Sequence, residues 1–368
     1  MNSKQRMRAL LTGEVPDRIG KADAPWPETR ARWRAEGIPD RVHASDHFQM
    51  DARHMFRTDI SFRLAETVEE DGPDWQVVRT PDGGLTKFWK TTGVPQHLAF
   101  GIRDRADWRR LRERLTPSTD RIGFGYYGDY AFEYTLAPYE AVRAAYQACA
   151  TAEETCVFLS VSEPYESFLE KMGDERLLMT LADDPEWVAE MFDAHVAFVA
   201  AQTDLLLAEG FRPDAVFLGG DIAYRNGLLF SPAMYRDLLM PRHRAMIAHF
   251  KAHGLPVIYH TDGNCAEAVG MLIEAGIDCL QPLEVRAGLD VRPLAEAFGD
   301  RIAFMGNISV EGLARGGAEM RQEIESKVKA MTAGGFRYIF HSDHSVPDQV
   351  PLAHYRQAME IVAECGAY

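Results

Sequence analysis

The sequence predicts an α/β protein built as a (β/α)8 TIM barrel with an N-terminal elaboration. From about residue 154 onward, short apolar runs that favour strands alternate with longer amphipathic stretches that favour helices, a pattern typical of a parallel sheet with helical crossovers. The strand-like runs are nearly all apolar, as expected for strands covered on both faces. Each run also ends in a polar residue, and in such a barrel these strand ends converge on one mouth, where the chemistry takes place.

The N-terminal part begins with a short predicted helix, which Ser3 can cap and Gly13 can end. The region that follows is irregular up to about residue 130. Within it, residues 75–92 form two β-rich runs around an Asp-Gly-Gly turn, which predicts a hairpin. Residues 123–134 form an aromatic loop, which we expect to cover the barrel mouth or to pack locally.

The regular part contains six predicted strands, separated by amphipathic stretches that predict helices. The strands lie at 156–164, 214–221, 256–264, 278–284, 301–307 and 336–344, and the helical stretches include 185–210, 232–253 and 264–275. We expect one domain over residues 1–368. In this domain, residues 1–150 hold the elaboration and the first barrel units, and residues 151–368 carry most of the site.

The composition is that of a globular protein that binds no nucleic acid. The chain has 368 residues, of which 46% are hydrophobic and 26% charged, with 40 Lys and Arg against 55 Asp and Glu. The net charge is therefore -15, and no basic run provides the positive face that nucleic-acid binders usually show. We expect a small-molecule substrate and a monomer or homodimer.

The sequence also predicts a cytoplasmic location. The chain has five cysteines and no Cys-x-x-Cys pair, so a disulfide framework is not expected. No stretch approaches about 18 consecutive apolar residues, so no membrane span is predicted, and the N-terminus shows no signal peptide. Cys265 is expected to be a small apolar residue on the first turn of a helix, and Cys279 to lie in the core.

The sharpest functional signal is a set of histidines and carboxylates at strand ends. In a strand, residues i and i+2 face the same side, so His260 and Asp262 can present a nitrogen and an oxygen together. His344, or else His341, would add a third ligand. Two histidines and one carboxylate suit Zn²⁺ with an open position, or Fe²⁺. The alternative is a polar cluster that binds substrate without metal.

Two further carboxylates, Glu163 and Asp221, are candidate acid/base or substrate-anchoring groups. Carboxylates that share one apolar mouth can take different pKa values and different roles. Helix capping is the alternative for both residues. The remaining candidates are expected to bind substrate, and they are Gln281, Asn307 and His341 at strand ends and the tyrosines Tyr126, Tyr127 and Tyr224.

Four segments together resemble the uroporphyrinogen decarboxylase-like superfamily. They are KQRMRALLTGEVPDRI (4–19), residues 219–264, GNISVEGLARG (306–316) and GGFRYIFHSDHSVPDQVP (334–351). The resemblance implies a (β/α)8 barrel with its site at the C-terminal mouth. It also implies one of two chemistries: cofactor-free decarboxylation of the acetate arms of a tetrapyrrole, or zinc-dependent methyl transfer to or from a corrinoid protein or a thiol.

The sequence departs from both branches of this superfamily. It lacks the RQAGR segment with which true uroporphyrinogen decarboxylases grip carboxylates, although Arg30, Arg32 and Arg34 occur in that region. The methyltransferase branch uses a His-x-Cys pair and a later Cys as ligands. Carried over, these positions are His260, Asp262 and His344, so that both thiolates are replaced by oxygen and nitrogen donors.

The resemblance and the ligand types together predict a zinc-dependent methyltransferase with a corrinoid protein as partner. A harder zinc site suits the polarisation of an oxygen, which favours a methyl donor such as a methyl ether. The alternative is a metal-free decarboxylase, in which arginines hold the carboxylates and Asp221 lies near developing positive charge. A third hypothesis, a binding protein on a barrel without activity, is disfavoured by the charge clustered at the strand ends.

Overall fold

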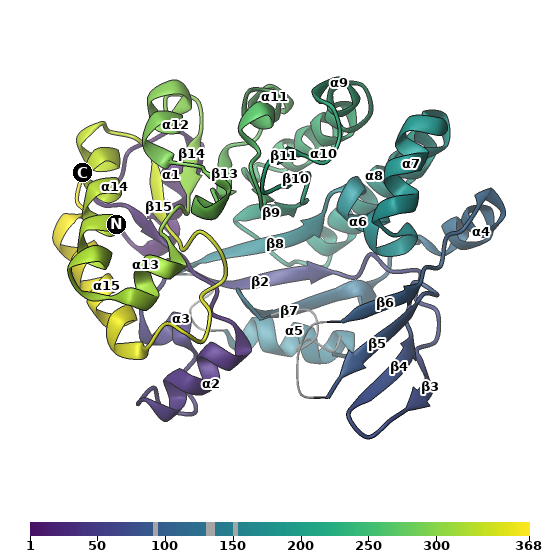
Figure 1. Ribbon diagram of the computed structural model, residues 1–368, viewed down its shortest axis with the longest axis horizontal. Coiled ribbons are helices and arrows are strands. Elements are labelled where there is room, and N and C mark those ends of the chain that lie inside the picture. The colour runs from purple at the N-terminus through teal and green to yellow at the C-terminus, as the bar shows by residue number, and fades with distance from the viewer. Residues whose placement is uncertain (91–94, 130–136, 150–153) are drawn as a thin grey trace.

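The protein is described by a computed structural model, which covers residues 1–90, 95–129, 137–149 and 154–368. Within these residues, a curled nine-stranded sheet forms the centre of the molecule (Figure 1). Its strand order is β1-β15-β14-β13-β12-β9-β8-β2-β7. The strands are β1 Gly20–Lys21, β2 Ala52–Thr58, β7 Ile122–Tyr126, β8 Cys156–Ser162, β9 Ala215–Gly219, β12 Val257–Thr261, β13 Cys279–Pro282, β14 Ala303–Met305 and β15 Tyr338–Phe340.

Eight of these strands run parallel, and only β7 pairs antiparallel, along β2. The carboxyl ends of the parallel strands therefore lie at one edge of the curled sheet, which is where ligands bind in such folds. The predicted parallel α/β arrangement is confirmed. The six predicted strands each contain an observed one, shorter by two to six residues because the polar ends leave the ladder.

The curl of the sheet brings β1 next to the start of β2. The backbone N–H of Asp51 donates to the carbonyl of Lys21 over 2.7 Å. The buried Asp51 carboxylate in turn accepts hydrogen bonds from Arg6, from Arg18 and from the backbone N–H of Lys21. One buried acid thus joins the N-terminal helix, β1 and β2, two strands that the sequence patterns did not single out.

Helices surround the sheet and follow most of its strands (Figure 1). They are α1 Ser3–Thr12, α2 Pro27–Ala35, α3 Ala44–His47, α4 Arg105–Leu111, α5 Tyr139–Ala148, α6 Pro164–Met172, α7 Asp174–Asp183, α8 Pro185–Ala208, α9 Pro232–Met234, α10 Met240–Ala252, α11 Val269–Ala275, α12 Val291–Phe298, α13 Val310–Arg315, α14 Gly317–Ala333 and α15 Leu352–Cys365. The predicted helices 185–210 and 232–253 are confirmed, the second with a π-helical segment at Tyr235–Leu239.

The first helix is confirmed with a different N-cap from the predicted Ser3. Asn2 occupies the cap position, accepts a hydrogen bond from the backbone N–H of Gln5, and completes a capping box with the Gln5 side chain. Gly13 ends the helix in the left-handed conformation, as expected. The chain therefore uses the stronger, reciprocal cap one residue earlier.

A smaller antiparallel sheet extends from the curled sheet. It contains β3 Thr67–Asp71, β4 Trp75–Arg79, β5 Leu85–Trp89 and β6 Gln96–Ala99, and the pairing of β4 with β5 confirms the predicted hairpin. A further two-residue pair, β10 Ala223–Tyr224 with β11 Gly227–Leu228, follows β9. Of the predicted aromatic loop, residues 123–126 form strand β7 instead, and residues 130–134 lie outside the described residues.

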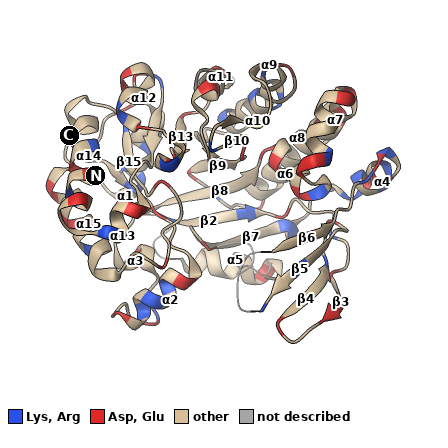
Figure 2. Ribbon diagram, in the orientation of Figure 1, with Lys and Arg blue, Asp and Glu red and all other residues tan. Residues whose placement is uncertain are grey.

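One helix, α8, is long and apolar enough to cross a membrane by length and composition alone. It packs with α6, α7 and α10, and its buried side chains, which include Trp187, Phe192 and Leu206, belong to the main core. Core helices pass the same test, so this is weak evidence for a span. Figure 2 shows acidic and basic residues interspersed over the surrounding helices.

Candidate functional site

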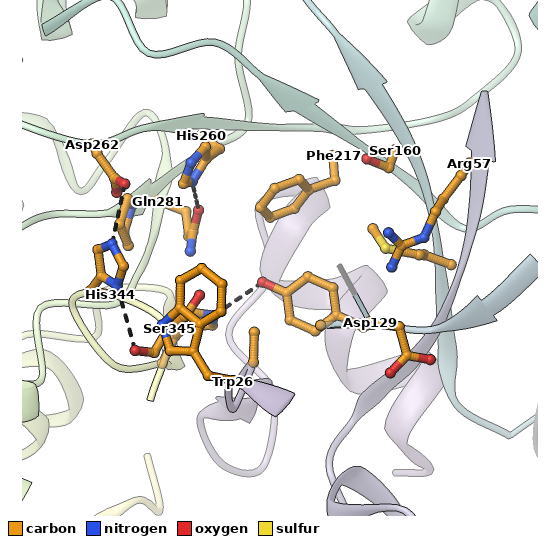
Figure 3. Close-up of a pocket in the computed structure, with 16 residues that line it drawn as sticks. Trp26, Arg57, Asp129, Ser160, Phe217, His260, Asp262, Gln281, His344 and Ser345 are labelled. Atoms are coloured by element: carbon orange, nitrogen blue, oxygen red, sulfur yellow. Dashed lines mark hydrogen bonds and ion pairs between the residues drawn. The ribbon is translucent and has the colours of Figure 1, made fainter. Parts of the chain in front are cut away.

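A cavity of about 290 Å³ lies at the carboxyl ends of the parallel strands (Figure 3). Ser160 of β8, Phe217 of β9, His260 of β12 and Gln281 of β13 line it from the sheet. Other lining residues are Trp26, Met55, Arg57, Tyr127, Asp129, Asp262, His341 and His344. The polar residues predicted at the ends of β12, β13 and β15 thus meet in one pocket with aromatic walls.

The imidazole of His260 is held in one orientation by Gln281. Nδ1 of His260 lies 2.5 Å from Oε1 of Gln281, and because a carbonyl oxygen only accepts, Nδ1 carries the proton. In the neutral ring Nε2 then carries the lone pair, 3.6 Å from Oδ1 of Asp221. Burial lowers the pKa of His260, but Asp262, Asp221 and the Gln281 hydrogen bond outweigh this effect and leave the pKa raised.

Asp221 and Asp262 lie next to each other beside this nitrogen. The backbone N–H of Asp262 donates to Oδ1 of Asp221 over 2.8 Å. Burial raises the pKa of the Asp262 carboxyl, against the opposing effect of His260. One side-chain oxygen, Oδ1 of Asp262, is buried without a hydrogen-bond partner, which is costly unless something binds it.

These three residues form a donor set that fits a metal ion. One ligand atom from each of Asp221, His260 and Asp262 lies within 4.8 Å of the others. Nitrogen and oxygen donors in this number suit Zn²⁺ with an open position, and Gln281 provides the outer hydrogen bond that such a histidine usually has. His344 is adjacent, with Nε2 3.7 Å from Oδ2 of Asp262.

The two histidines after β15 have different surroundings. His344 is 45% exposed at its side chain and stacks on Trp26, with ring centroids 6.2 Å apart. His341 is buried, and its Nε2 lies 3.0 Å from the hydroxyl of Tyr127. Burial lowers the pKa of His341, which favours the neutral ring. His341 therefore lines the pocket as a neutral hydrogen-bonding group, next to Tyr127, which the sequence analysis expected there.

Glu163 lies outside the pocket and caps a helix. Its carboxylate accepts hydrogen bonds from the backbone N–H groups of Tyr165 and Glu166 at the start of α6 and lies 2.9 Å from Nε2 of His243. Its side chain is fully buried. The capping alternative therefore describes Glu163, because a helix N-terminus stabilises a buried carboxylate.

Asn307 is also held away from the pocket. Its amide donates to the carbonyls of Leu283 and Leu289, and its side-chain oxygen accepts from the backbone N–H of Val291. The residue has a φ of 66°, which Asn tolerates better than most residues. These hydrogen bonds fix the loop after β13 and use the side chain for structure.

Two of the three predicted tyrosines do not line the cavity. Tyr224 is 49% exposed on the β10–β11 pair. The hydroxyl of Tyr126 donates to Asp46 over 2.6 Å, and its ring stacks on His43. A tyrosine next to a predicted pocket cannot be assigned to it from sequence, because Tyr126 ends β7 and binds Asp46, whereas its neighbour Tyr127 lines the pocket.

Sequence reasoning missed Glu166 and Arg57. Oε2 of Glu166 accepts from the backbone N–H of Asp221 over 3.1 Å, and burial, with Asp221 nearby, raises its pKa to about 8. Its position three residues after Glu163, on the first turn of α6, is a signal that could have found it. Arg57 lies across the pocket from His260, near Asp129 (Figure 3), on a strand within the region read as irregular.

The arginines of the N-terminal region do not enter the cavity. Arg30 is buried and pairs with Asp129 over 3.3 Å, and it also donates to backbone carbonyls. Arg32 pairs with Glu36 on the same helix. Arg57 is the only Lys or Arg among the described residues that line the pocket.

The two cysteines that the sequence analysis assigned to apolar surroundings, Cys265 and Cys279, are buried, as expected. Burial raises the pKa of the Cys265 thiol to about 12 and raises that of Cys279 as well. Neither thiol is poised to ionise, so the donors of this site are nitrogen and oxygen atoms.

The fold and the site define an α/β enzyme-like protein with a pocket at the carboxyl edge of a parallel sheet. The family model of uroporphyrinogen decarboxylase (URO-D) matches residues 139–365, and the chain belongs to this family. No curated protein matches the chain significantly.

Among solved structures, a methyltransferase from Methanosarcina mazei is similar over 99% of both chains, with a TM-score of 0.63 and 13% identity. This likeness shows a shared fold. An endo-β-1,4-mannanase double mutant from Cellulomonas fimi is similar over 62% of this chain and 59% of that chain, with a TM-score of 0.34 and 14% identity.

Proposed function

We propose that the protein is a zinc-dependent methyltransferase that moves a methyl group between a small methylated substrate and a corrinoid protein. The observation that carries the proposal is the oriented donor set of His260, Asp262 and Asp221 at the carboxyl edge of the sheet. Membership of the URO-D family and the fold shared with a methyltransferase support it. We also infer that the curled sheet is a (β/α)8 barrel with an N-terminal elaboration and that the protein is cytoplasmic.

In this proposal, Zn²⁺ is held by His260, Asp262 and Asp221, with His344 near enough to join them. When bound, zinc acts as a Lewis acid on an oxygen of the substrate. Gln281 keeps Nε2 of His260 available, since its Oε1 accepts a hydrogen bond from the Nδ1–H group. Glu166, with its pKa near 8, keeps its proton at neutral pH and so adds no charge beside Asp221.

The pocket indicates the size and chemistry of the substrate. A cavity of about 290 Å³ holds a small molecule and is at the lower end of ligand pockets. Trp26, Phe217 and Tyr127 supply aromatic walls, and Arg57 supplies a cation across from the donor set (Figure 3). We therefore propose a small aromatic or apolar methyl ether with an anionic group. One cation and this volume do not suit a tetrapyrrole with many carboxylates.

The test is methyl transfer from a panel of methyl ethers to free cob(I)alamin, which is followed by its absorbance. Each ether is offered with and without a carboxylate, and thiols and amines are included. We expect zinc-dependent transfer that is lost in His260→Ala and retained in His97→Ala, a matched change of an exposed histidine on β6. The proposal is wrong if the wild-type protein binds a zinc ion that His260→Ala does not, and no donor transfers a methyl group.

A metal-free decarboxylase is the second candidate, and Arg57 favours it, because a guanidinium holds a carboxylate well. Asp221, 42% exposed at its side chain and beside His260, would then face positive charge that develops in the reaction. Release of CO₂ from a small carboxylate that persists with a chelator would support this candidate. Loss of that activity on chelation would exclude it.

A further inference from the structure

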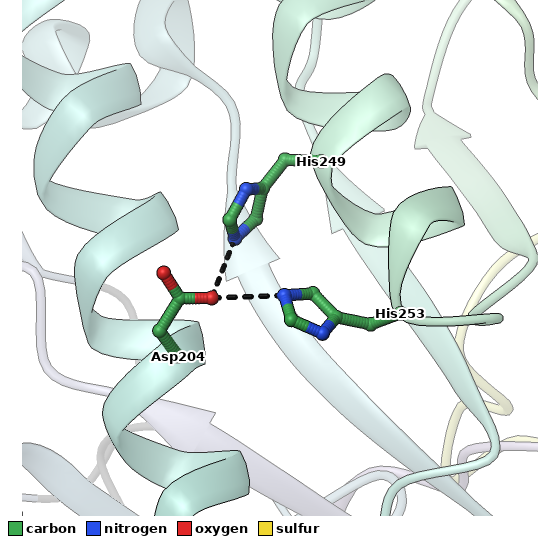
Figure 4. A group of neighbouring side chains, drawn as sticks. All are labelled: Asp204, His249 and His253. Carbon is green, nitrogen blue, oxygen red and sulfur yellow. Dashed lines mark hydrogen bonds and ion pairs between the residues drawn. The ribbon is translucent and has the colours of Figure 1, made fainter.

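A second group of metal-type side chains lies away from the pocket, between α8 and α10 (Figure 4). Asp204 lies in the last turn of α8, His249 in the last turn of α10, and His253 at the C-cap of α10. Nε2 of His249 and Nε2 of His253 lie 3.0 Å and 2.8 Å from the same atom, Oδ1 of Asp204. One donor atom of each residue lies within 4.8 Å of the other two.

The position of this group in the fold separates it from the pocket. Helix α8 leads into β9 and helix α10 leads into β12, so the C-terminal ends of both helices lie at the amino ends of these parallel strands. The pocket lies at the opposite, carboxyl ends of the same strands. A ligand at Asp204, His249 and His253 therefore cannot share the space of the proposed substrate.

Three features favour a cation over a simple hydrogen-bonded cluster. His249 and His253 are one helical turn apart on one face, a spacing that binds metal in other proteins. Both helices present their C-terminal ends here, and the partial negative charge of these ends favours a cation. Nε2 of His249 is buried and makes no hydrogen bond of good geometry, although Oδ1 of Asp204 is 3.0 Å away, so the cluster leaves this nitrogen unsatisfied.

We propose that Asp204, His249 and His253 bind a divalent transition metal of the Zn²⁺ type and thereby join α8 to α10. Two imidazoles and one carboxylate are the donors that Zn²⁺ takes, with water in the fourth position. The ion would replace the contacts of both rings with Oδ1 of Asp204. This proposal does not depend on the proposed function, because none of its residues lies in the pocket.

The same two helices supply a matched control. Arg242 of α10 pairs with Asp193 of α8, with Nε and Oδ1 2.8 Å apart. This ion pair also joins the two helices, but neither residue can be a ligand at the proposed site. Asp193→Asn therefore perturbs the helix pair and leaves the three metal donors unchanged.

The experiment is calorimetric titration of the full chain with Zn²⁺, in a His260→Ala background that removes the oriented imidazole from the donor set of the pocket. We expect one Zn²⁺ per chain in this background and in His260→Ala with Asp193→Asn. Adding His249→Gln or Asp204→Asn should weaken binding by about 100-fold or more, because even an outer-sphere change costs up to that much. The melting temperature should rise with Zn²⁺ in the first two proteins only.

Two results would overturn the proposal. One is that the His260→Ala protein binds no Zn²⁺. The other is that His249→Gln and Asp204→Asn, folded by circular dichroism, bind Zn²⁺ as tightly as the background protein. The result does not depend on the methyl-transfer assay described above, because these variants are tested only for Zn²⁺ binding.

Discussion

Replacement of His195 by glutamine should flatten the dependence of stability on pH between about 4 and 6.5. His195 lies on α8 with a side chain that is 1% exposed, and its Nε2 donates to the carbonyl of Ser162 at the end of β8 over 2.8 Å. Nδ1 is buried without a hydrogen-bond partner. Protonation of the neutral ring would place a second proton on Nδ1, which has no hydrogen-bond acceptor, and would leave a positive charge buried.

The size of the effect follows from the pKa of His195. Burial lowers this pKa from 6.5 to about 4, against the opposing hydrogen bond to Ser162. Between these values the unfolded chain binds the proton and the folded chain does not, so stability falls as the pH falls. The full shift corresponds to about 3 kcal/mol at about 1.4 kcal/mol per pKa unit, and about 2 kcal/mol of it is lost between pH 7.5 and pH 5.

The assay is urea unfolding of the wild-type protein and of His195→Gln at pH 7.5 and at pH 5. Glutamine keeps a donor for Ser162 and removes the titrating ring, so the wild type should lose about 2 kcal/mol more than the variant. The comparison cancels other titrating groups, among them His54, whose pKa burial also lowers to about 4. Equal losses in the two proteins would refute the reasoning.

Three further changes have outcomes that the structure predicts. Gln281→Leu removes the acceptor of His260 and should lower Zn²⁺ affinity in calorimetry about 10- to 100-fold, whereas Gln281→Glu, which keeps an acceptor, should not. Arg57→Met should raise the KM of a carboxylated substrate about 10- to 100-fold and leave the KM of its neutral analogue unchanged. An equal change in both KM values would contradict a role for Arg57 in binding the carboxylate. Asp51→Asn leaves two arginine side chains without their buried partner and should cost about 3 kcal/mol or more in urea unfolding, against less than about 1 for the surface change Asp193→Asn.

The fold could be read from the sequence where each strand is a continuous apolar run and each helix is amphipathic. This held from β8 onward. It failed for β1 and β2, because Gly20–Lys21 is too short to form a pattern and because β2 carries His54 and Arg57 among its apolar residues. Arg57 lines the pocket and the ring of His54 packs against Tyr126, so these polar side chains interrupt the apolar run by which a strand is recognised.

Part of the site could also be predicted from the apolar strands, because polar residues follow them. His260 and Asp262 were found because polar residues end an apolar strand, and this logic also selected Asn307 and Glu163. Sequence could not separate the two pairs, since a strand-end carboxylate or amide satisfies backbone N–H groups as readily as it binds a ligand. Only the partners in space, three backbone contacts for Asn307 and an orphaned oxygen for Asp262, distinguish the two roles.

The charges in the pocket give a reason for the donor set to hold a cation. Asp221, Asp262 and Glu166 lie close together, and the pKa values of Asp262 and Glu166 are raised. Two imidazoles face them among the described residues: His260, whose own pKa the same carboxylates raise, and the more exposed His344, with Nε2 3.7 Å from Oδ2 of Asp262. Half-buried carboxylates in excess of cations destabilise a fold, so this arrangement is maintained at a cost to stability. A divalent ion at Nε2 of His260 would offset that cost, whereas a carboxylated substrate would add to it unless Arg57 held its charge at the far side of the pocket.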